Sequence, residues 1–169
     1  MKCPRLRYLL PLLASLMLML GADAIATYTP NQYNIDQRIA AITWDAACRI
    51  SQYEVCPDKG PAVRRSPVVG ELGRARGIYF VGSYVVWLDP EIGGSQAWLT
   101  TFHEQIHFLQ SANLVEMAEY DDHLLDCLVE REALDFTNAY ALELRRPDLQ
   151  RTLADWYELY ECHPRIMHM

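Results

Sequence analysis

The sequence predicts a mostly helical α+β fold, in which a small sheet or hairpin packs on two helices. Apolar residues recur at helical spacing between positions 35 and 50, as in a helix with one buried face. Two short runs rich in β-branched and aromatic residues, 78–81 and 84–88, predict strands. A long helix is expected at 123–146, and it stops before Pro147.

The first 26 residues have the layout of a secretory signal peptide. Basic residues precede an apolar run from Leu9 to Leu20, and small residues follow it. The segment Ala24–Ala26 fits the A-x-A cleavage rule, and Ala22–Ala24 is an alternative. The run is shorter than the about 20 apolar residues of a spanning helix, so we expect cleavage rather than an anchor. The sequence therefore predicts a secreted or periplasmic protein with one domain at 27–169 and no stable membrane association.

The charge of the chain limits its partners. Its formal net charge is −7, and loss of residues 1–26 removes three basic residues and one acidic residue, which makes the charge −9. A protein this acidic is not expected to bind nucleic acid or an anionic membrane surface.

Four cysteines remain after residue 26, and an even number in an exported chain predicts disulfide bonds. We expect the pairs Cys48–Cys56, which closes a short loop, and Cys127–Cys162, which ties the last helix to an earlier one. Free buried cysteines are the alternative. The spacings are not C-x-x-C, so a cysteine zinc knuckle is not expected.

The individual elements follow from local signals. Asn34 or Asp36 is expected to cap the first helix, and the Pro-, Gly- and charge-rich segment 56–77 reads as an irregular loop. Gly82-Ser83, between the two strand-like runs, suggests a hairpin or a bent strand.

Three helices are expected in the second half. Ser95 would cap a helix that runs to about Ala112, and Asp121 or Asp122 would cap the long helix. Asp148 would cap a final helix at 149–160.

The segment TTFHEQIHFLQ, 100–110, contains two histidines four residues apart. Residues at i and i+4 share a helix face, so His103 and His107 can bind one metal ion. Glu104 lies at the edge of that face, where it can reach a water molecule without being a ligand. This is the arrangement of zinc peptidases, with the glutamate as general base. H-E-x-x-H also arises by chance, but a position in a helix that follows a strand-like run favours a Zn²⁺ site.

Zinc needs a third protein ligand if one position is to stay open for water. The metzincin pattern would place a histidine at Asn113 and a glycine at Gln110, so that pattern fails. The other route is a glutamate from a second helix, where CLVEREALDF offers Glu130 and Glu132. The two point about 200° apart on one helix, so at most one should reach the ion.

The flanking residues favour Glu130 as that ligand. Small side chains lie above and below it at helical spacing, which lets two helices approach closely: Cys127, Ala133, Thr137 and Ala141. Bulky residues flank Glu132 and would hold a partner helix away: Leu128, Val129 and Phe136.

HEQIH followed about 25 residues later by E-R-E-A resembles the gluzincin clan of zinc peptidases over residues 78–140. In several members the glutamate ligand begins a Glu-x-x-Ala-Asp motif, and this resemblance also implies Glu130 as the third ligand. It implies a zincin-like domain, with a strand before the motif along which an extended peptide or protein substrate binds by main-chain hydrogen bonds.

The chain departs from the clan pattern at Leu134, where the clan has an aspartate that orients a zinc-bound histidine. Asp122, Asp126 and Asp135 are the alternatives, and the sequence does not choose among them.

Full-size gluzincins also have a second subdomain whose His or Tyr stabilises the oxyanion. Here His123 is the first choice for a catalytic role, because it lies seven residues before Glu130 on the same helix face. A solvent-exposed histidine at a helix start is the alternative interpretation. Four other residues could serve as donors: Tyr120, Tyr140, Tyr157 and His163.

The sequence thus predicts an exported zinc-dependent metallopeptidase of minimal gluzincin type. Glu104 would act as general base and then pass the proton to the leaving amine. Two alternatives are a catalytically silent zinc-binding module and a metal-free interaction domain. The small size and Leu134 favour the silent module somewhat.

Overall fold

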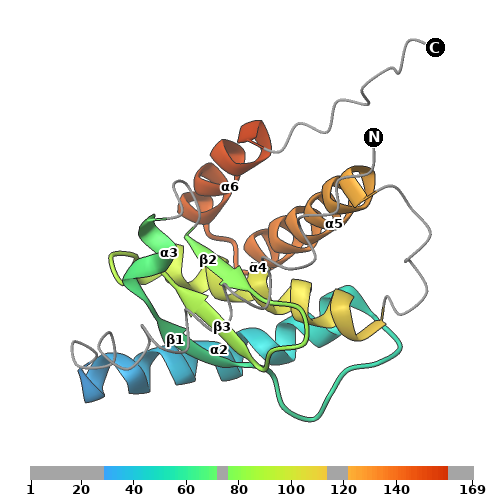
Figure 1. The fold of residues 1–169 in the computed structure, drawn as a ribbon. Coiled ribbons are helices and arrows are strands. Elements are labelled where there is room, and N and C mark those ends of the chain that lie inside the picture. The colour runs from blue at the N-terminus through green and yellow to red at the C-terminus, as the bar shows by residue number, and fades with distance from the viewer. Residues whose placement is uncertain (1–28, 72–75, 114–121, 160–169) are drawn as a thin grey trace, which may run out of the picture.

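The computed structural model of the protein describes residues 29–71, 76–113 and 122–159 (Figure 1). Helices dominate, and one small sheet completes the fold, which confirms the α+β prediction at this level. The elements are, in chain order, α2 (Pro30–Ser51), β1 (Ala62–Arg65), α3 (Pro67–Glu71), β2 (Gly77–Tyr79), β3 (Val85–Leu88), α4 (Gly94–Asn113), α5 (Asp122–Glu143) and α6 (Pro147–Leu159). The expected signal peptide lies outside the described residues.

The sheet has the order β1-β3-β2. The strands β2 and β3 pair antiparallel, with Tyr79 opposite Val86, as the predicted hairpin requires. Strand β1 runs parallel to β3 on its other side, with Val63 opposite Val86. This makes β3 the central strand and β2 an edge strand.

The prediction of an irregular loop at 56–77 is wrong at two places, 62–65 and 67–71, which form β1 and α3. Within β1 only Val63 is fully buried, so the sequence of the strand does not show the alternation of apolar and polar residues that predicts a strand. The hydrogen bonds of β1 depend on β3, a partner more than 20 residues away in the chain.

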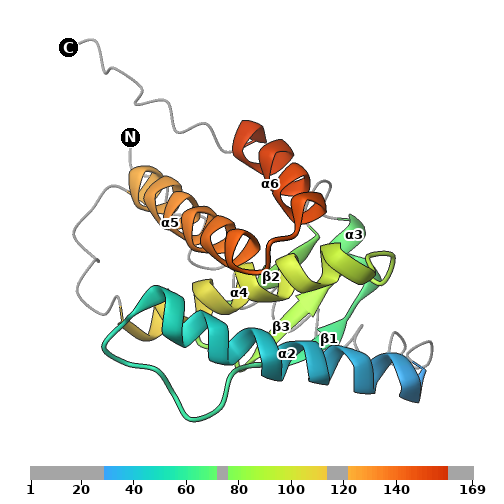
Figure 2. The same ribbon diagram turned by 180° about the vertical axis from the view of Figure 1, so that it is seen from behind.

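The central element is α4, which contacts α2, α5, α6, β2 and β3. Both views show α4 crossing the middle of the molecule between the sheet and α5 (Figures 1 and 2). Its apolar side chains Phe102, Ile106 and Leu109 are fully buried in one core cluster. A helix that is covered on several sides in this way can hold polar side chains away from solvent.

The predicted caps of α2 and α4 are wrong. Helix α2 begins earlier, because the Thr29 hydroxyl accepts a hydrogen bond from the Gln32 backbone N–H and Pro30 occupies the first turn. In α4 the backbone carbonyl of Gly93 accepts the first helical hydrogen bonds.

Ser95 and Asp148, both predicted as caps, bind each other instead. The Ser95 hydroxyl donates to the Asp148 carboxylate at 2.7 Å, and the Arg146 guanidinium contacts both residues. Helix α6 begins at Pro147, so Asp148 lies within its first turn. This contact joins the N-terminal ends of α4 and α6.

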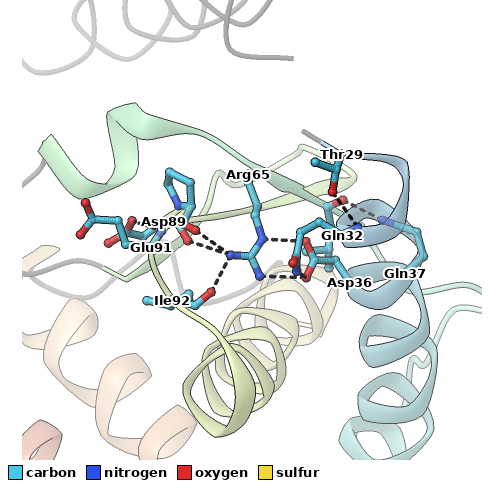
Figure 3. A network of polar contacts seen from close by, with 10 residues as sticks. Thr29, Gln32, Asp36, Gln37, Arg65, Asp89, Glu91 and Ile92 are labelled. Atoms are coloured by element: carbon cyan, nitrogen blue, oxygen red, sulfur yellow. Dashed lines mark hydrogen bonds and ion pairs between the residues drawn. The ribbon is translucent and has the colours of Figure 1, made fainter. Parts of the chain in front are cut away.

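Arg65 of β1 forms a buried ion pair with Asp36 of α2 (Figure 3). Its Nε and Nη2 atoms donate to the two carboxylate oxygens at 2.7 and 2.9 Å, and the side chains are 6% and 0% exposed. Its Nη1 atom donates to three backbone carbonyls between β3 and α4, those of Asp89, Pro90 and Ile92. One guanidinium therefore joins α2, the sheet and the entry to α4.

Replacement of Arg65 by methionine should destabilise the protein by about 3–5 kcal/mol, because it leaves the buried Asp36 carboxylate without its opposite charge. Urea unfolding of the variant and the wild type, with the disulfide intact, measures the difference. The control is Arg49→Met, which breaks an exposed ion pair with Glu143 whose side chains are 58% and 46% exposed. That change should cost less than about 1 kcal/mol, and equal losses in the two variants would contradict the proposed importance of the buried pair.

A disulfide bond joins Cys48 and Cys56, whose Cα atoms lie 5.8 Å apart, as the sequence predicts. Asn113, at the end of α4, also holds the loop that the disulfide closes. Its side-chain oxygen accepts a hydrogen bond from the Val55 N–H, and its side-chain nitrogen donates to the Val55 carbonyl. The other expected pair, Cys127–Cys162, lies outside the described side chains. Within the described ranges, no helix combines the length and apolar character needed to cross a membrane.

Candidate metal centre

The histidines of α4 meet one glutamate of α5. His103 Nε2 lies 3.1 Å from His107 Nε2, because the two rings project from the same face of the helix one turn apart. The Glu130 carboxylate oxygens lie 3.3 Å from His103 Nε2 and 3.4 Å from His107 Nε2. The structure therefore brings together the three residues expected as metal ligands, close enough to hold one ion.

The spacing of these atoms fits a tetrahedral ion. Zinc bonds of about 2.0–2.1 Å place tetrahedral ligand atoms about 3.3 Å from one another, and the three observed distances lie between 3.1 and 3.4 Å. The Glu130 Oε2 atom is buried and forms no hydrogen bond of good geometry among the described residues. Two imidazoles and one carboxylate would leave a fourth position open, and such a donor set suits a transition-metal ion.

Hydrogen bonds on the far side of each ring direct Nε2 toward this position. His107 Nδ1 donates to Gln110 Oε1 at 2.8 Å. His103 Nδ1 lies 3.5 Å from the Thr137 hydroxyl oxygen, and that hydroxyl donates its own proton to the Ala133 carbonyl. Gln110 Oε1 can only accept, so it holds a proton on Nδ1 of His107 and directs Nε2 toward the metal position, and the Thr137 oxygen lies where it could accept the Nδ1 proton of His103.

Glu104 is buried beside strand β2. Its carboxylate lies near the Tyr79 backbone N–H, which favours the charged form. The strand approaches so closely that a Cβ atom at Gly77 would lie 2.9 Å from Glu104 Cγ and 2.4 Å from Thr100 Cγ2. A glycine is thus required where β2 crosses α4, a feature that the sequence analysis missed.

The charged groups of the centre shift one another's pKa. Burial lowers the pKa of His107, but Glu130 and Glu104 outweigh this effect and raise it to about 9. Burial raises the pKa of Glu130, yet the imidazoles of His103 and His107 hold it well below its usual range. Burial also raises the pKa of Glu104, against the opposing effect of the two histidines. Glu130 therefore stays ionised, as a metal ligand must, whereas Glu104 holds a proton more readily than an exposed glutamate.

An aromatic ring packs against one side of the centre. Trp156 of α6 contacts the His103 ring edge to face, with centroids 5.7 Å apart. The side chains of His103 and His107 are only 8% and 14% exposed, whereas that of Glu130 is 30% exposed. Solvent therefore reaches the centre more easily on the side of Glu130.

The aspartate of the clan motif has no direct substitute among the described residues. Leu134 is fully buried in an apolar cluster with Leu99 and α6. Asp135 lies at the surface and contacts Arg131. The Thr137 hydroxyl, three residues beyond Leu134, contacts His103 instead. The side chains of Asp122 and Asp126 lie outside the described part of the chain.

The expected oxyanion donors lie mostly outside the described residues. Helix α5 includes His123, but the structure does not describe its side chain, so its catalytic role stays a prediction. Tyr140 is buried in the core, where its ring stacks on Phe102. Burial raises the pKa of the Tyr140 phenol to about 12. The remaining donors are not described: Tyr120, the Tyr157 side chain and His163.

Glu132, the carboxylate not favoured as a ligand, contacts the residues behind His107. It accepts hydrogen bonds from Gln110 Nε2 at 2.8 Å and from the Tyr53 hydroxyl. These roles of Gln110 and Tyr53 were not predicted from the sequence. A local signal existed for Gln110, because it lies three residues after His107 on the same helix face.

Comparison of the chain with protein-family models, with curated proteins and with solved structures gives no match. The gluzincin resemblance rests on the HEQIH and EREA motifs. The geometry of the centre rests on the contacts among His103, His107 and Glu130.

Proposed function

We propose that the protein is an exported zinc metallopeptidase with a zincin-like domain that hydrolyses peptide bonds. The observation that carries this proposal is the position of Glu104 beside the group formed by His103, His107 and Glu130. A general base next to a site with three protein ligands and an open fourth position is the arrangement that metal-assisted hydrolysis requires.

The donor set supports zinc as the ion. Two histidines and one glutamate are the ligands of a well-known group of catalytic zinc sites, whereas structural zinc sites use four protein ligands, mostly cysteines. When bound, zinc would polarise the substrate carbonyl and lower the pKa of water in the open position.

Glu104 would move the proton during hydrolysis. Its raised pKa suits a group that takes a proton from the attacking water and then gives it to the leaving amine. The carboxylate faces the Tyr79 backbone N–H, and Gly77 makes room for it. The position of the base is therefore set by the edge strand as well as by α4.

The edge strand also supports a peptide as the substrate. Strand β2 pairs with β3 on one side and ends the sheet order β1-β3-β2 on the other. An extended peptide that paired with this edge would run past Glu104, held by main-chain hydrogen bonds that carry little sequence preference. Export is supported by the signal-like residues 1–26 and by the Cys48–Cys56 disulfide, which suits an oxidising compartment.

A second candidate function is a zinc-binding module without turnover. The low exposure of the His103 and His107 side chains favours it, because a buried centre restricts the approach of a protein substrate. The two candidates share the metal and differ in catalysis.

A peptide library distinguishes them. Residues 27–169, purified with the disulfide formed, should contain about one zinc ion per chain and cleave peptides. Cleavage should stop with 1,10-phenanthroline, continue with the non-chelating 1,7 isomer, and return when zinc is added. Zinc without cleavage of any peptide would support the binding module, and a protein that takes up no metal would refute both candidates.

A further inference from the structure

We infer that Gln110, Glu132 and Tyr53 form a hydrogen-bonded chain that positions His107 and so raises the affinity of the centre for its metal. The inference rests on the proposed metal site and names residues outside the group formed by His103, His107 and Glu130. Tyr53 and Glu132 are positioning residues that act through Gln110.

The Gln110 amide has its orientation fixed from α5. This side chain is buried, and its Nε2 atom donates to the Val129 carbonyl at 2.9 Å and to Glu132 Oε2 at 2.8 Å. An amide nitrogen has two protons, so both are used on α5. The Oε1 atom must then face α4, where it accepts the Nδ1 proton of His107. The direction of the amide therefore determines which nitrogen of His107 is free for a metal.

The same amide acts on the second ligand-bearing helix. Val129, whose carbonyl binds Gln110, directly precedes Glu130 in α5. A single side chain thus connects the ring of His107 with the turn of α5 that carries the glutamate ligand. Loss of these bonds should disturb the spacing of two ligands at once, as is typical of partners behind metal ligands.

Tyr53 completes the chain from outside the helices. Its hydroxyl donates to the Glu132 oxygen that also accepts from Gln110. Its ring packs edge to face on Phe136 of α5, with centroids 5.9 Å apart. Burial and the neighbouring Glu132 carboxylate raise the pKa of the Tyr53 phenol, so the phenol keeps the proton that it donates.

The loop that carries Tyr53 is itself held in place. The Cys48–Cys56 disulfide closes it, and Asn113 bonds Val55 within it. The chain therefore extends from this closed loop through Glu132 and Gln110 to the imidazole of His107. Among the residues linked by these hydrogen bonds, His107 alone belongs to the group that lies close enough together to hold an ion.

The test measures zinc affinity by chelator competition, together with the absorption spectrum of the Co²⁺-substituted protein. Gln110→Met keeps length and removes both functions of the amide, and it should weaken zinc binding about 10- to 100-fold. Tyr53→Phe keeps the ring and removes the donor, and Glu132→Ala removes the shared acceptor. Both should weaken binding by less, up to about tenfold, because each acts through Gln110. The Co²⁺ bands of Gln110→Met should shift, since the orientation of a ligand changes.

Two further variants separate positioning from stability. Glu132→Gln keeps an oxygen that accepts from Tyr53 and Gln110, so it should restore most of the affinity lost in Glu132→Ala. Gln37→Met removes a similar glutamine bond to a backbone carbonyl, that of Val63, at a place remote from the centre. It should lower the melting temperature of the metal-free protein and leave zinc affinity unchanged.

Three outcomes would overturn the inference, and only the last would also overturn the proposed function. If the wild type binds zinc but Gln110→Met and Tyr53→Phe bind it equally well, the chain does not position His107 and the proposed function stands. The same conclusion follows if Gln37→Met loses as much affinity as Gln110→Met. If the wild type binds no zinc, the proposed function and the inference fail together.

Discussion

Glu104→Gln should abolish peptide hydrolysis while the protein keeps its zinc. Glutamine has nearly the same shape, and its carbonyl oxygen can still face the Tyr79 N–H. It cannot take a proton from water, and loss of a positioned base typically lowers the rate about 100- to 10,000-fold. The change also removes a group whose raised pKa reflects the cost of burying its charge, so the metal-free protein should be no less stable.

The measurement is kcat/KM on a peptide found by the library, with zinc content determined on the same sample. Glu143→Gln is the matched control, because it makes the same chemical change on the surface of α5, where Glu143 pairs with Arg49. That variant should retain wild-type activity and zinc. Substantial turnover by Glu104→Gln would remove Glu104 from the mechanism, whereas loss of zinc would show that the carboxylate also contributes to metal binding.

Glu130→Ala should lose the metal, whereas Glu132→Ala should stay loaded. Glu130 supplies one of the three ligand atoms, and protein zinc sites bind with about 10–16 kcal/mol in all. Removal of one ligand should therefore weaken binding about a thousandfold or more, equivalent to about 4 kcal/mol. Glu132 lies on a different face of α5 and contacts Gln110 and Tyr53, so its loss has only an indirect effect.

Zinc content after exhaustive dialysis and chelator competition on both variants measure the difference. Glu132→Ala serves as the control, since the two changes are identical and two positions apart on one helix. A loaded Glu130→Ala together with an empty Glu132→Ala would move the ligand to Glu132. Two loaded variants would mean that the third ligand lies elsewhere, and His123 would be the next residue to test.

The group formed by His103, His107 and Glu130 could be predicted because its signals are local. The i, i+4 spacing places His103 and His107 on one face of any helix, whatever it packs against. Small residues around Glu130 indicate where a second helix can come close, and α4 and α5 do meet there. The strands β2 and β3 and the long helices of the described ranges, α2, α4, α5 and α6, were also predicted, from periodicity in α2 and from composition, capping residues and Pro147 elsewhere.

The features that were missed depend on contacts between distant segments. Strand β1 exists because β3 completes its hydrogen bonds, and Ser95 and Asp148 bind each other rather than capping their helices. Similarly, Asp36 was expected to cap α2 but binds Arg65 in the interior. In each case a contact with a residue far away in the sequence overrides the local propensity. Such a contact cannot be predicted from the neighbouring residues.

The partner of His103 illustrates the same limit within the centre. The clan motif predicts an aspartate as the partner of His103, whereas the residue that contacts the His103 ring is Thr137. Leu134 and Thr137 lie on the same side of α5, and the way in which α4 and α5 cross determines which of them contacts the His103 ring. The Thr137 hydroxyl, one turn after Leu134, can therefore be recognised as the partner of His103 only when the positions of the two helices are known.

The burial of the centre has a kinetic consequence. Its ligands come from two separate helices, and the two imidazole side chains are almost wholly shielded from solvent. An ion bound by both imidazoles and by Glu130 would be released mainly when α4 and α5 part locally, because its ligands come from both helices, so the opening of the helix pair would slow its release. Chelators would then remove the metal at a rate that stops rising with chelator concentration, and slow exchange could accompany even a moderate equilibrium affinity.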